Sequence, residues 1–91
     1  MKKFIIERDL PGAGNLNGTE LRDISKTSCN IVEGLNKPYH WIETYVTENK
    51  MFCIHIAENE ETIREHSKRA GFPIKSIREV TNIIDPTSCN I

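Results

Sequence analysis

Residues 39–57 read YHWIETYVTENKMFCIHIA, and this stretch decides the fold. Its two outer parts, residues 39–47 and 51–57, are rich in the aromatic and β-branched residues that favour strands. The three residues between them, Glu48, Asn49 and Lys50, are polar and suit a short turn. Two such runs joined by a few polar residues predict an antiparallel hairpin.

A strand and then a helix are predicted before this hairpin. Residues 2–8 contain the apolar run Phe4-Ile5-Ile6, which suits a buried strand, and residues 10–15 are turn formers. Apolar residues then recur at helical spacing up to Leu35, from a start near Asn17 or Thr19. Gly34 and Pro38 end this helix, because proline cannot continue the hydrogen-bond ladder.

A helix and then a strand are predicted after the hairpin. Residues 59–70 begin with Asn59, a good N-cap, and carry acids in the first turn and bases in the last, as the helix dipole favours. Gly71 and Pro73 end the helix. Residues 76–84, SIREVTNII, predict the last strand, which Asp85 and Pro86 close.

The order strand, helix, strand, strand, helix, strand predicts an α+β domain of the ferredoxin-like β-α-β-β-α-β kind. Its antiparallel sheet is expected to carry both helices on one face. A chain of 91 residues suits one domain, here residues 1–91 with a tail from about residue 86. A core of this size is modest, so an interface with a second copy is a natural way to bury more apolar area.

Charge and cysteine content narrow the possible partners. Lys and Arg total 12 and Asp and Glu total 13, and the two signs are interspersed, so we expect no nucleic-acid partner. No apolar run reaches membrane length and no signal peptide is recognisable, so we expect no membrane partner and a cytoplasmic location. The three cysteines form no C-x-x-C pair, which argues against zinc-ribbon and thioredoxin-like sites.

The alternation of side chains along the hairpin predicts which residues the helices leave uncovered. If the aliphatic residues face the helices, the free face carries Trp41, Glu43, Tyr45, Met51, Cys53 and His55. A face this apolar needs a cover, so we expect a homodimer in which two sheets pack face to face as a dimeric α+β barrel.

The polar members of this expected face are the candidate site. Glu43, His55 and Cys53 are ligand types that suit nickel, zinc or copper, with Trp41 and Tyr45 beside them as cofactor- or ligand-binding residues. Three functions remain open at this point. They are a metal-binding dimer, a small-molecule carrier or enzyme with His55 or Glu43 transferring a proton, and an interaction module whose polar groups pair across the dimer. No catalytic triad or zinc-enzyme motif has recognisable spacing, which favours binding over catalysis.

Several stretches resemble a family of small bacterial nickel-binding proteins. They are KFIIERDLPGAG (3–14), HWIETYVTENKMFCIHIAENEETIREHSKRAGFP (40–73) and IREVTNIIDP (77–86). The resemblance implies a ferredoxin-like domain, a homodimer, and nickel or another divalent metal bound for sequestration or homeostasis. Members of that family commonly carry histidine where this chain has Glu43, and often tyrosine where it has His55.

Overall fold

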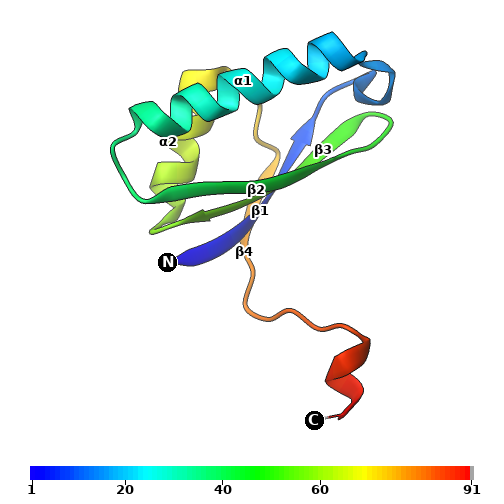
Figure 1. Cartoon of the computed structure of the whole chain (residues 1–91), viewed down its shortest axis with the longest axis vertical. Helices are drawn as coiled ribbons and strands as arrows, with labels where there is room; N and C mark the ends of the chain where they lie inside the picture. Colours follow the sequence, from blue (N-terminus) through cyan, green and yellow to red (C-terminus); the bar gives the residue numbers. More distant parts are fainter. Residues whose placement is uncertain (91) are drawn as a thin grey trace.

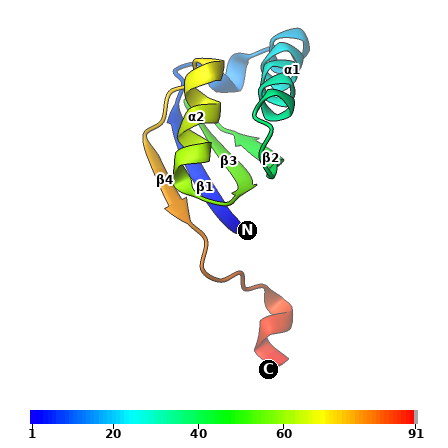
Figure 2. The same ribbon diagram turned by 90° about the vertical axis from the view of Figure 1, so that its left-hand side faces the viewer.

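The computed structural model describes residues 1–90, and its centre is a four-stranded antiparallel sheet in the order β2-β3-β1-β4. The elements are β1 (Lys2–Asp9), η1 (Ala13–Asn15), α1 (Gly18–Gly34), β2 (Tyr39–Val46), β3 (Lys50–Ala57), α2 (Glu60–Ala70), β4 (Ser76–Glu79) and η2 (Pro86–Asn90). Both helices cover the same face of the sheet (Figures 1 and 2). The predicted β-α-β-β-α-β ferredoxin-like fold is therefore confirmed.

The two central strands, β1 and β3, set which residues the helices bury. They pair along their whole length, with Phe4 opposite His55 and Ile6 opposite Cys53. Directly opposed residues in an antiparallel pair project to the same face, so these four share the helix-covered side. The buried apolar cluster on this side comprises Phe4, Ile6, Leu35, Tyr39, Cys53, Ala57 and Ile63.

Local signals fix the start of each helix and the end of α2. Asn17 caps α1 through a reciprocal capping box with Glu20, in which each side chain accepts a hydrogen bond from the other residue's backbone N–H. The side chain of Asn59 caps α2 in the same position. Gly71 ends α2 with a φ of 73°, a left-handed conformation that glycine adopts without steric cost.

The last strand is shorter than the sequence predicts. The expected strand over residues 76–84 ends at Glu79, with one further backbone hydrogen bond from Val80 to Lys3. In this antiparallel register Thr81 would lie opposite Lys2, but among the described residues no backbone hydrogen bond joins Thr81 or Asn82 to β1. The chain then leaves the domain (Figure 1), and Ile83 and Ile84 are 69% and 83% exposed.

Within residues 1–90, no helix has the length and apolarity needed to cross a membrane.

Substitution of Asn17 tests whether the capping box of α1 stabilises the protein. We expect Asn17→Ala to lower the free energy of unfolding by about 1 kcal/mol, because it leaves the Glu20 N–H without its acceptor. Asn30→Ala, at an exposed position inside the same helix, is the matched control and should cost nothing. Urea denaturation of both variants measures the difference, and equal stabilities would refute the role assigned to the cap.

Candidate functional site

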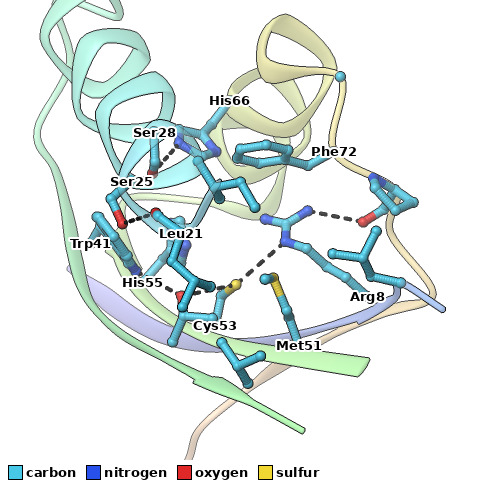
Figure 3. Close-up of a pocket in the computed structure, with 16 residues that line it drawn as sticks. Arg8, Leu21, Ser25, Ser28, Trp41, Met51, Cys53, His55, His66 and Phe72 are labelled. Carbon is cyan, nitrogen blue, oxygen red and sulfur yellow. Dashed lines mark hydrogen bonds between the residues drawn. The ribbon is translucent and has the colours of Figure 1, made fainter. Parts of the chain in front are cut away.

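A cavity of about 460 Å³ lies between the helices and the covered face of the sheet (Figure 3). Its wall is mostly apolar, with contributions from α1, α2, the loop after α2 and the three strands β1 to β3. The polar groups on the wall are Arg8, Ser25, Ser28, Thr44, Cys53, His55 and His66. An apolar cavity of this size with a few convergent polar groups has the character of a ligand site.

Arg8 is the charged group of this cavity. It belongs to the buried side of β1, together with Phe4 and Ile6, and is only 3% exposed. Its Nη1 donates to the Ser67 hydroxyl at 2.9 Å and to the Pro73 carbonyl at 3.0 Å, while its Nε donates to Sγ of Cys53 at 3.4 Å.

The guanidinium of Arg8 also lies 5.4 Å from the centre of the Phe72 ring. Every one of these partners is neutral, and within residues 1–90 no carboxylate forms an ion pair with it. Its Nη2 is buried and has no hydrogen-bond partner among the described residues.

Two histidines lie deeper on the same wall and are packed with Tyr39. The ring of His66 stacks on Tyr39 at 5.2 Å, and His55 meets both rings edge-on. The Tyr39 hydroxyl and Nδ1 of His55 share a hydrogen bond of 2.5 Å, and Nε2 of His66 lies 3.2 Å from the Ser28 hydroxyl. Nδ1 of His66 is a second buried nitrogen for which the described residues offer no partner.

Burial keeps both histidines uncharged. The pKa of His55 is lowered to about 3, mainly by burial and further by the neighbouring His66 and Arg8. Burial and then the Arg8 charge lower the pKa of His66 to about 4. Both rings are therefore neutral near pH 7, and Arg8 is the positive charge of the cavity.

Cys53 joins Arg8 to the edge strand β2. Its sulfur accepts a hydrogen bond from Arg8 and another from the Thr44 hydroxyl at 3.2 Å. The Thr44 oxygen in turn accepts from Nε1 of Trp41 at 2.9 Å. This chain of hydrogen bonds holds the Trp41 ring against the cavity, where it forms part of the wall.

The predicted arrangement of the hairpin was wrong in β3. Met51, Cys53 and His55 face the helices and are buried, while Phe52, Ile54 and Ile56 lie on the open face. Both faces of β3 carry apolar residues, so the side-chain pattern of the hairpin alone does not separate them. The pairing with β1 decides, because the Phe4 and Ile6 side of β1 packs against the helices.

In β2 the predicted alternation of side chains between the two faces is also wrong, because this strand contains a β-bulge. The pairing with β3 shifts between Trp41 and Glu43, so one residue is inserted there. Trp41 before the shift and Thr44 after it both face the cavity. Glu43 and Tyr45 lie opposite Ile54 and Phe52 on the open face, where the Tyr45 hydroxyl donates to the Glu43 carboxylate.

The structure thus separates the candidate site residues. Trp41, Cys53 and His55 line the cavity, whereas Glu43 and Tyr45 lie on the other side of the sheet. No group of three or more His, Cys, Asp or Glu side chains converges within residues 1–90 in a way that could hold a metal ion. The cavity itself does not suit a divalent cation, because the Cys53 sulfur is hydrogen-bonded to a cationic guanidinium.

Three residues of interest were not among the candidate site residues predicted from the sequence. Arg8 shares its parity with Phe4 and Ile6, a signal that could have placed it inside. His66 belongs to the buried stripe of α2 with Ile63 and Ser67. His40 pairs with Ile56, which places it on the open face with Glu43.

Comparisons with known proteins give one family and one similar fold. The family model for nickel responsive proteins of the SCO4226-like type matches residues 4–80. The crystal structure of SCO4226 from Streptomyces coelicolor A3(2) aligns with a TM-score of 0.76 over 90% of this chain and 99% of that chain, at 14% sequence identity. At this identity the likeness shows the fold. No curated protein matches the sequence.

The neutral histidines predict a pH-dependent stability. Their folded pKa values, about 3 and about 4, lie below the unfolded value of 6.5, so the unfolded chain binds more protons as the pH falls. Stability is therefore full above about pH 7 and is lost from pH 6.5 downward.

Between pH 7 and 5.5 we expect a loss of about 2–3 kcal/mol, from two groups at about 1.4 kcal/mol per unit each. Urea denaturation at both pH values measures it, and His66→Gln should remove about half of the change. Equal stability at the two pH values would contradict this assignment.

Proposed function

The chain belongs to the SCO4226-like nickel responsive protein family, and from this premise we propose that it is a homodimer that binds a divalent metal, nickel first, at the open face of its sheet. The observation that carries the proposal is the placement of His40 and Glu43. Both project from β2 on the face that the helices leave uncovered, beside an apolar strip.

The apolar strip supports dimerisation. It consists of Ile5 from β1 and Phe52, Ile54 and Ile56 from β3, with Tyr45 from β2 beside them. Ile5 is 39% exposed and Tyr45 is 55% exposed. A contiguous apolar strip across a sheet is a surface that a second copy can cover, and a chain of 91 residues gains stability by burying it.

Other charged groups lie at one end of the same face. Nζ of Lys50 lies 2.7 Å from a carboxylate oxygen of Glu7 and 2.7 Å from one of Asp9. The hydrogen bonds from Lys50 hold the pKa of both carboxyl groups below their usual values. These acids are therefore already paired with a cation, which leaves Glu43 and His40 as the better metal-binding groups of this face.

An imidazole and a carboxylate are a ligand pair that suits nickel. Glu43 lies opposite Ile54 and His40 opposite Ile56, so the two groups project from neighbouring positions of the strip. Two ligands from one chain leave the coordination of the ion incomplete. In a symmetric dimer the second copy and water complete it, since a two-fold axis presents each group twice.

Of the ligand set predicted from the sequence, Glu43 remains a proposed ligand, and His40 takes the place of Cys53 and His55. The reason is the charge of the cavity, where Arg8 donates to the sulfur of Cys53 and His55 is engaged by Tyr39. A protein of this kind, with its metal groups at a surface that assembly covers, is suited to sequestering a metal.

Metal titration tests the ligand assignment. We expect the purified dimer to bind Ni²⁺ in isothermal titration calorimetry, and His40→Ala or Glu43→Ala to weaken binding at least about tenfold through loss of a ligand. Glu48→Ala, an exposed acid in the turn after β2, is the matched control and should bind as the parent does. Binding that survives both ligand variants would place the metal elsewhere, and no binding by the parent would end the proposal.

Assembly is tested separately by charge insertion. We expect Ile54→Glu to convert the dimer into a monomer, because the carboxylate would have to be buried in the interface without a partner. Asn30→Glu, on the exposed surface of α1, adds the same charge on the other side of the molecule and should leave the dimer intact. Size-exclusion chromatography with light scattering reports the mass, and a parent chain that runs as a monomer would refute the interface.

A further inference from the structure

Arg8 presents an unbalanced charge inside the molecule. It is 3% exposed, every hydrogen-bond acceptor it reaches is neutral, and its Nη2 has no partner among residues 1–90. A buried ion is stable when an opposite charge and hydrogen bonds replace the water it has lost. Arg8 has some of the hydrogen bonds and none of the opposite charge, so its surroundings favour an anion.

The cavity next to Arg8 has room for such an anion. Its volume of about 460 Å³ lies within the range of small-molecule sites. The wall beyond Arg8 is apolar and includes Leu21 and Ile24 of α1, Met51 of β3 and Phe72. Figure 3 shows the guanidinium of Arg8 between the side chains of Phe72 and Met51.

The composition of the wall narrows the class of ligand. No carboxylate of residues 1–90 lines the cavity, so none of its described wall offers a negative charge to a cation. One fixed positive charge matches one negative charge, which disfavours nucleotides and other multiply charged phosphates. The remaining polar groups are neutral, and the two free N–H bonds of Nη2 are directed donors that suit a planar oxyanion.

We propose that this cavity binds a small apolar monocarboxylic acid, with its carboxylate accepting hydrogen bonds from Arg8 and its hydrocarbon body lying between α1 and the sheet. His66 adds a second contact, because its buried Nδ1 also lacks a partner and the ring lines the same cavity. Nε2 of His66 shares a hydrogen bond with the Ser28 hydroxyl, so Nδ1 is the ring nitrogen left to meet the ligand, and it donates when it carries the ring proton.

The route into the cavity runs between α1 and the hairpin. Val46, at the end of β2, is 40% exposed and still lines the cavity, and Leu21 and Ser25 on the facing side of α1 are half-buried. This entrance lies on the helix side of the sheet. The site is therefore separate from the open face proposed for nickel and the second copy, and each can be tested without the other.

A matched pair of ligands tests the charge requirement. We expect 3-phenylpropanoate to bind in isothermal titration calorimetry at pH 7.5, and 3-phenylpropanamide, which has the same hydrocarbon body without the charge, to bind at least about tenfold more weakly. Equal affinities would overturn the proposal, since they would make the site a neutral apolar pocket. Absence of binding by both would overturn it as well.

A matched pair of variants tests whether Arg8 binds the carboxylate. Arg8→Met keeps the length and apolar stem of the side chain, and should abolish the preference for the carboxylate. The same variant leaves the Ser67 hydroxyl and the Pro73 carbonyl without their donor, so circular dichroism is used to check that it remains folded. Lys68→Met, which removes an exposed cation from the last turn of α2, is the control and should keep the preference for the carboxylate.

Two results would refute the role of Arg8. One is an Arg8→Met variant that folds and still prefers the carboxylate. The other is a loss of that preference in Lys68→Met, which would mean that net charge and not the cavity attracts the acid. Glu43→Ala should bind 3-phenylpropanoate as the parent does, so a failure of the nickel proposal leaves this result unaffected.

Discussion

Arg8 is the only side chain with a fixed charge among the buried residues of the described chain, and it connects the two layers of the fold. From β1 it reaches the sulfur of Cys53 in β3, the hydroxyl of Ser67 in α2 and the carbonyl of Pro73 in the following loop. A guanidinium can make these contacts at once because its donors are fixed in a plane. The position of α2 on the sheet therefore depends on a polar contact as well as on apolar packing.

The charge of Arg8 also makes the two sides of the sheet differ in the ligands they suit. On the helix side it adds to the burial that keeps His55 and His66 neutral, and it donates a hydrogen bond to the sulfur of Cys53, so the softest metal ligand of the hairpin faces a cation. On the open side the free ligand types are the carboxylate of Glu43 and the imidazole of His40. A divalent cation is thus favoured outside the core and an anion inside it.

The sequence predicted the order of elements, the fold class and the caps of α2, because these depend on local signals such as Asn59 before α2 and Gly71 after it. It did not predict the candidate site, because that depends on which face of β3 the helices cover. Phe52 and Ile54 look as suited to a core as Met51 and Cys53, and only the pairing with β1 distinguishes them. The bulge in β2 carries no glycine or proline that would have marked it.

The same bulge lets β2 contribute side chains to both proposed sites, the cavity and the open face of the sheet. In a regular strand Trp41, Glu43 and Tyr45 would share one side, and either all or none would face the cavity. The inserted residue reverses the alternation, so that Trp41 and Thr44 form the hydrogen-bonded wall beside Cys53 while Glu43 and Tyr45 bond to each other outside. An edge strand is the place where such an insertion is tolerated, since only one of its sides is paired. The separation of the proposed anion site from the proposed metal site by a single sheet therefore follows from one irregularity in its edge strand.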